Sequence, residues 1–125
     1  MVEGNRVLLI GFDPNAVPGV DARLVETAIA MGEVRLEAAG FETDYCLVAP
    51  DDAAEPQIVE SLVSKPYDCV VVGGGIRKPE PFLELFERIV NLIRVHAPRA
   101  AIAFNTTGEN SVDAVLRWIA PPEGP

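Results

Sequence analysis

Glycines and two cations follow one of the apolar runs of this chain in a pattern that could bind an anion. Gly73, Gly74 and Gly75 come directly after the run 68–72, and Arg77 and Lys78 follow them. Consecutive glycines let a backbone turn tightly and present N–H groups to a ligand. With Arg77, those amides would suit a carboxylate or a phosphate. The alternative is a solvated turn whose cations meet local acids such as Asp13, Glu80 or Glu109.

A second cluster follows the first apolar run. Phe12, Asp13, Pro14 and Asn15 stand at the point where that run ends. A carboxylate at such a position can act as a general acid or base, and Asn15 can donate a directional hydrogen bond. Phe12 would give the site an apolar wall. The alternative is an Asp-Pro turn that satisfies only its own backbone.

A third cluster is dense in short hydrogen-bonding side chains. The segment 105–111 reads Asn-Thr-Thr-Gly-Glu-Asn-Ser after the run 100–104. Asn110 or Ser111 is expected to cap the helix that follows. Asn105 and Thr106, nearest the apolar run, are the better candidates for a ligand or a transition state. A purely structural, hydroxyl-rich turn is the alternative.

The elements that would position these clusters alternate along the chain. Short β-branched runs predict strands, and segments with helical periodicity follow each of them. Asp21 is expected to cap the first helix and Gly40 to end it in a left-handed conformation, and Pro79 suits the first turn of a later helix. The expected strands are 6–11, 41–48, 68–72 and 100–104, and the expected helices are 22–39, 55–64, 79–97 and 111–119.

This alternation predicts a three-layer α/β fold, a doubly wound parallel sheet covered by helices on both faces. Right-handed crossovers give the strand order 2-1-3-4, a shortened flavodoxin-like winding, with the first and fourth helices on one face. The chain direction reverses between strands one and three. A crevice should therefore form there from 11–18 and 73–78, with 105–111 beside it.

Bulk composition limits the function classes. The chain has 125 residues, 49% hydrophobic and 23% charged, which predicts a single globular domain over 1–125. A net charge of −9 without a basic stripe argues against nucleic acid as a partner. The sequence has no apolar stretch near the roughly 20 residues that span a bilayer, so we expect a cytoplasmic protein without a membrane partner.

The remaining reactive side chains indicate no metal site and no cofactor. Cys46 and Cys69 lie inside expected strands with a third strand between them, which predicts buried thiols that cannot form a disulfide. His96, the only histidine, falls at a helix end on the opposite edge of the sheet from the crevice. Neither a G-x-G-x-x-G nor a Walker pattern is present, so nucleotide binding has no support.

Two resemblances add to these expectations. The segment Val7-Leu8-Leu9-Ile10-Gly11-Phe12-Asp13-Pro14 looks like the first strand and loop of pyrrolidone carboxyl peptidases. The Cys and His that this family needs at later strand ends have no counterpart here, so the resemblance carries no activity. The whole chain resembles small uncharacterised bacterial proteins with a flavodoxin-like (Rossmann-like) arrangement, which implies a fold but no function.

Apolar surface in excess of what a core requires predicts a homodimer. In the helix that begins at Pro79, apolar residues fill about half of the circumference, more than the roughly 100° typical of a surface helix. A second subunit or the helix 55–64 would cover the excess. Trp118 and the edge of the strand 100–104 are further candidate contacts. Arg35 falls in an apolar arc and is expected to extend its head group toward solvent or to pair with an acid.

The sequence thus favours a protein that binds a small anionic metabolite at the carboxyl ends of the strands. If it is an enzyme, which the sequence leaves open, metal-independent hydrolysis or lyase chemistry fits best. Asp13 would then move a proton, and Asn105 with the amides of Gly74 and Gly75 would stabilise developing negative charge. The alternative is a non-catalytic homodimeric interaction or regulatory module.

Overall fold

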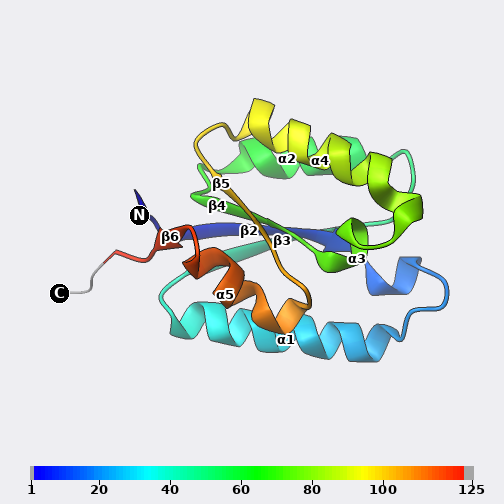
Figure 1. Cartoon of the computed structure of the whole chain (residues 1–125), viewed down its shortest axis with the longest axis horizontal. Coiled ribbons are helices and arrows are strands. Elements are labelled where there is room, and N and C mark those ends of the chain that lie inside the picture. The colour runs from blue at the N-terminus through cyan, green and yellow to red at the C-terminus, as the bar shows by residue number, and fades with distance from the viewer. Residues whose placement is uncertain (1, 123–125) are drawn as a thin grey trace.

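A four-stranded, all-parallel sheet forms the centre of the molecule (Figure 1). The computed structural model describes residues 2–122. In the first strand it describes the side chain of Glu3 alone. The strand order is β3-β2-β4-β5, which confirms the order expected from the sequence. The strands are β2 (Arg6–Phe12), β3 (Glu42–Val48), β4 (Cys69–Val72) and β5 (Ala101–Phe104).

Helices cover both faces of this sheet, as predicted (Figure 1). On one face lie α1 (Ala22–Ala38) and α5 (Ser111–Leu116), and on the other lie α2 (Ala54–Ser64) and α4 (Leu83–His96). Successive strand residues point to opposite faces, so β2 supplies two cores. Leu8 and Ile10 belong to the core beneath α2 and α4, whereas Val7 and Leu9 belong to the core beneath α1 and α5.

The ends of α1 follow the expected local chemistry. The side chain of Asp21 accepts a hydrogen bond from the amide of Leu24 at 3.2 Å and so caps the first turn. Gly40 has φ of 96°, a conformation that favours glycine. The amides of Gly40 and Phe41 donate to the carbonyls of Glu37 and Leu36, which is a Schellman ending.

The chain departs from the expected elements in three places. The segment Gly74–Arg77, expected as an open loop, forms a single helical turn, α3. The helix expected from Pro79 starts as a 3-10 turn, η2 (Glu80–Phe82), before α4. The last helix ends at Leu116 rather than at 119, because the chain then extends as β6 (Ile119–Ala120) and pairs in parallel with β1 (Val2–Glu3). Two further 3-10 turns, η1 (Pro14–Ala16) and η3 (Gly108–Asn110), precede α1 and α5.

The two cysteines are free and buried, as predicted. Cys46 lies on β3 and Cys69 on β4, and β2 runs between these strands. Burial raises the pKa of the Cys46 thiol and raises that of Cys69 to about 12. Both thiols are therefore protonated at neutral pH.

The wide apolar arc of α4 is covered in part by α2. Leu85, Phe86 and Leu92 are half-buried against the core on that side of the sheet. Leu83 and Val95 remain 52% and 61% exposed.

No helix within residues 2–122 combines the length and apolar character that crossing a membrane requires.

Candidate functional site

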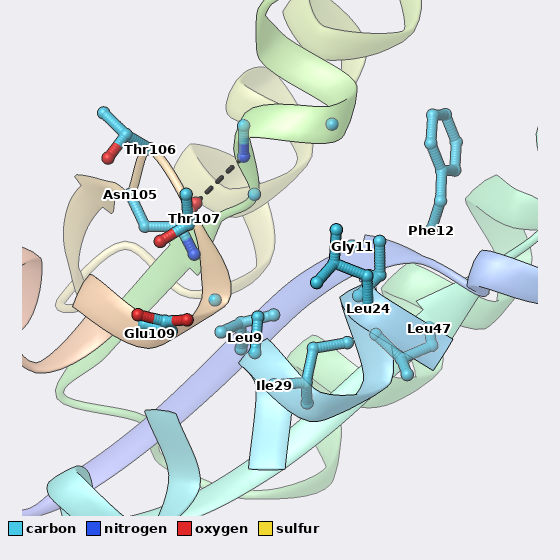
Figure 2. Close-up of a pocket in the computed structure, with 16 residues that line it drawn as sticks. Leu9, Gly11, Phe12, Leu24, Ile29, Leu47, Asn105, Thr106, Thr107 and Glu109 are labelled. Atoms are coloured by element: carbon cyan, nitrogen blue, oxygen red, sulfur yellow. Dashed lines mark hydrogen bonds between the residues drawn. The ribbon is translucent and has the colours of Figure 1, made fainter. Parts of the chain in front are cut away.

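A cavity of about 430 Å³ opens at the carboxyl edge of the sheet, on the face covered by α1 (Figure 2). It lies between the first half of α1 and the segment that follows β5. The position is the strand-end edge at which parallel sheets bind ligands. Its lining comprises Leu9, Gly11, Phe12, Leu24, Val25, Ala28, Ile29, Leu47, Gly73, Gly74, Gly75, Asn105, Thr106, Thr107, Gly108 and Glu109.

The walls of the cavity are mainly apolar. Four aliphatic side chains of α1 form one side, and Leu9 and Leu47 come from the sheet (Figure 2). Gly11 lies between these two leucines, and a Cβ built on it would stand 3.6 Å from Leu9 Cδ2 and 3.5 Å from Leu47 Cδ2. The space above the sheet is therefore open because residue 11 has no side chain.

Polar groups lie on the opposite side of the cavity. Thr106, Thr107 and Glu109 all belong to the segment after β5 (Figure 2). Glu109 is the only charged residue of the lining. Gly75 also lines the cavity, and its backbone amide has no hydrogen-bond partner among residues 2–122. The polar side thus comprises two threonine residues, one carboxylate and a glycine whose amide is unpaired.

Asn105 connects the two loops that carry this polar side. Its side chain is buried, with 4% of the residue exposed. Its Oδ1 accepts a hydrogen bond from the amide of Gly74 at 2.9 Å (Figure 2). Its Nδ2 donates to Ser111 Oγ at 3.0 Å. A Cβ on Gly74 would lie 2.8 Å from the carbonyl oxygen of Thr106, so this close approach also requires glycine. Asn105 therefore positions α3 against the turn that leads into α5.

Arg77 and Lys78 bind the same turn from outside the cavity lining. Arg77 Nη2 donates to the carbonyl of Asn105 at 3.0 Å, and Lys78 Nζ donates to the carbonyl of Thr106 at 2.8 Å. The guanidinium carbon of Arg77 lies 5.9 Å from the centre of the Phe104 ring, within cation–π range. Arg77 Nε is buried and has no partner among the described residues. Both cations thus donate hydrogen bonds to backbone carbonyls of the turn that follows β5.

Asp13 and Asn15 form a local turn at the end of β2. Asp13 Oδ1 accepts a hydrogen bond from the amide of Asn15 at 2.9 Å and caps η1. Asn15 Nδ2 donates to Glu26 Oε1 at 2.9 Å, which ties the turn to α1. Neither residue belongs to the cavity lining. This geometry matches the alternative considered for Asp13, a turn in which the carboxylate accepts hydrogen bonds from its own neighbours in the chain.

The structure thus brings part of the sequence-predicted set together. Phe12, the three glycines, Asn105 and Thr106 line one cavity, whereas Asp13, Asn15, Arg77 and Lys78 do not. Sequence reasoning missed the wall that α1 provides. The signal for that wall was the helical spacing of Val25, Ala28 and Ile29, which places these residues on one side of α1.

Comparisons with known proteins add no homologous site. The chain matches no family model, no curated protein and no solved structure. Within the described part of the chain, no three His, Cys, Asp or Glu side chains are grouped so that they could hold a metal ion.

Proposed function

We propose that this protein binds a small molecule with an apolar body and one hydrogen-bonding group in the cavity between α1 and the β5–α5 segment. The observation that carries the proposal is the cavity, whose volume of about 430 Å³ lies in the range of small-molecule sites. Apolar walls with a few polar groups on one side are the usual composition of such sites.

The ionic groups that line the cavity indicate which ligand charge it would accept. The sequence favoured an anionic metabolite because of Arg77 and Lys78, but neither cation belongs to the lining, and both donate to the backbone carbonyls of Asn105 and Thr106. Glu109 supplies the only charge in the lining, and it is negative. A neutral or cationic ligand is therefore better supported than an anion.

The geometry favours binding over catalysis. Both side-chain groups of Asn105 are engaged in hydrogen bonds, and Asp13 caps its own turn. The proton transfer predicted for Asp13 and the charge stabilisation predicted for Asn105 would require those side chains to face the ligand. The polar residues of the lining besides Asn105 are Thr106, Thr107 and Glu109, and Thr106 Oγ1 already accepts a hydrogen bond from Asn110 Nδ2, which leaves its O–H as a donor.

A set of three matched probes tests the proposal. Cyclohexylmethanol, cyclohexylmethylamine and cyclohexanecarboxylate share one apolar body and differ in charge. We expect saturation-transfer NMR to show binding of the alcohol and the amine and weaker binding of the carboxylate. Carboxylate binding that is lost in Arg77→Met would support the anionic ligand instead.

A cavity-filling variant provides the structural control. Gly11→Val should fill the space between Leu9 and Leu47 and so abolish binding of all three probes. The branched side chain of valine suits a strand, so we expect the variant to fold. Ala30→Val, an exposed position of α1 outside the lining, should leave binding unchanged. Absence of binding by every probe, or equal binding by Gly11→Val, would refute the proposal.

One observation favours the alternative function, a homodimeric interaction module. Trp118 and Leu116 are 54% and 40% exposed at the end of α5. Arg117, between them, donates to the carbonyl of Phe104 at 2.9 Å, so this segment lies beside the outer edge of β5. A second copy that covers Trp118 would appear as a dimer in sedimentation velocity at micromolar concentration, and Trp118→Ser should return it to monomer.

A further inference from the structure

The outer edge of β3 presents unpaired backbone groups. β3 is an edge strand whose neighbour is β2. The amide of Glu42 donates to Asn5 at 2.7 Å, and the carbonyl of Val48 accepts from Asp13 at 2.9 Å, so the even-numbered residues direct their backbone groups toward β2. Because these directions alternate along a strand, the backbone groups of Thr43, Tyr45 and Leu47 point outward. They have no hydrogen-bond partner within residues 2–122.

Two side chains of these outward residues also lack partners. Thr43 Oγ1 and the hydroxyl of Tyr45 are buried and make no hydrogen bond to any described residue. Tyr45 packs against the core on the α1 side, and Thr43 shares its face because the two residues are two positions apart. Buried hydroxyls without partners are uncommon in folded proteins. Both lie along the same strand that carries the unpaired backbone groups.

Acidic side chains border this edge. Glu33 and Glu37 on α1 lie near Tyr45, and together with burial their negative charge raises the pKa of Tyr45 to about 12. Glu60 on α2 lies near Cys46 on the other face. The neighbouring cations, Arg6 and Lys65, are close to Asp44, and Lys65 forms an ion pair with it at 3.0 Å.

This charge distribution distinguishes between possible occupants. A second copy paired edge to edge would bring two acidic borders together, which like-charge repulsion disfavours. An extended segment with Lys or Arg side chains would meet opposite charge on the α1 face. Addition of a strand to an exposed sheet edge is a recurring mode of peptide recognition, in which backbone hydrogen bonds supply affinity.

We propose that the outer edge of β3 binds an extended, basic peptide segment as a fifth strand of the sheet. The amides and carbonyls of Thr43, Tyr45 and Leu47 pair with its backbone. Glu33 and Glu37 attract its cationic side chains.

The test uses the full chain and three fluorescein-labelled octapeptides. One alternates Lys and Val, one alternates Glu and Val, and the third is the Lys-Val peptide with N-methyl groups on alternate amides. Fluorescence anisotropy should show binding of the unmodified Lys-Val peptide and little binding of the other two. Amide exchange followed by NMR should slow at Thr43, Tyr45 and Leu47, whereas Asp44 and Cys46, already bonded to β2, should change little.

Paired variants separate specific attraction from general attraction to an acidic protein. Glu33→Gln with Glu37→Gln should weaken binding by about threefold to tenfold, since each surface charge contributes modestly. The same changes at Glu80 and Glu87, on the far side of the sheet, should leave affinity unchanged. Equal binding of the methylated peptide, or unchanged exchange at the three amides, would overturn the proposal. A dimer that protects the same amides without peptide would also overturn it and identify a second copy as the occupant.

Discussion

Gly32 and Gly108 touch through their backbones where α1 crosses the turn before α5. A Cβ built on Gly32 would stand 2.0 Å from the carbonyl oxygen of Gly108, and one on Gly108 would stand 3.0 Å from the amide nitrogen of Ile29. Arg35 Nη1 also donates to the carbonyl of Glu109 at 3.2 Å. This contact fixes the distance between the two sides of the cavity.

Gly32→Ala should therefore destabilise the protein. Helix propensity alone would make this change favourable by about 1 kcal/mol. The overlap with backbone at Gly108 cannot be relieved by rotating a side chain, so we expect a net loss of about 1–3 kcal/mol in the free energy of unfolding by urea. Gly75→Ala, whose Cβ would meet open space, should change stability little. A stabilised Gly32→Ala would show that α1 can move away from the turn.

Asn105→Ala should loosen the contact between α3 and α5. It leaves the buried amide of Gly74 without its acceptor and removes the donor to Ser111 Oγ. The cost of an unsatisfied buried group is about 1–3 kcal/mol. Urea denaturation measures the loss, and Thr106→Ala, at an exposed neighbouring position, is the matched control. If both variants lose the same stability, Asn105 does not act through its buried hydrogen bonds.

Tyr45→Phe should change the response to alkaline pH. The folded pKa of Tyr45 is raised from 10.0 to about 12. Because the folded pKa exceeds the unfolded one, this contribution to stability is complete below pH 10 and is lost as pH rises toward 12. Above pH 10 the wild type should lose more stability than the Phe variant does.

The same variant should be at least as stable as the wild type at pH 7. It removes a buried hydroxyl that has no partner, which we expect to be neutral or to stabilise by up to about 1 kcal/mol. Thermal unfolding scans of both proteins between pH 7 and 11 measure the difference. Destabilisation at pH 7 would mean that the hydroxyl makes a hydrogen bond in solution.

The two cysteines should react only after unfolding. Cys69 is fully buried with a pKa of about 12, and Cys46 is buried with a raised pKa. Since the thiolate is the reactive form, an aromatic disulfide reagent at pH 7.5 should titrate neither thiol in the native protein and both in guanidinium. Rapid reaction of Cys46 in the native state would indicate that β3 separates readily from α2.

The scaffold was predictable from the sequence because its local signals agree with one another. The apolar runs locate the strands, and Asp21 and Gly40 mark the two ends of the first long helix. The alternation of strands and helices then leaves few possible strand orders. The β1–β6 pairing was missed because two-residue strands carry no periodicity. The early end of α5 follows from the same pairing, since Ile119 is buried beside β1 rather than in a helix.

The candidate site was less predictable because it depends on which groups satisfy one another. Arg77 and Lys78 looked available for an anion when only their neighbours in sequence were considered. The carbonyls that accept their hydrogen bonds belong to Asn105 and Thr106, nearly thirty positions later. The space over Gly11 likewise depends on the positions of Leu9, Leu47 and α1, which only the folded backbone determines.

The short ribbon of β1 and β6 brings the first and last described strands side by side, with Gly4 also donating to the carbonyl of Ala120 at 2.9 Å. A permutant that links residues 122 and 2 across this ribbon and opens the chain at the exposed Gly19 should therefore retain every strand of the central sheet.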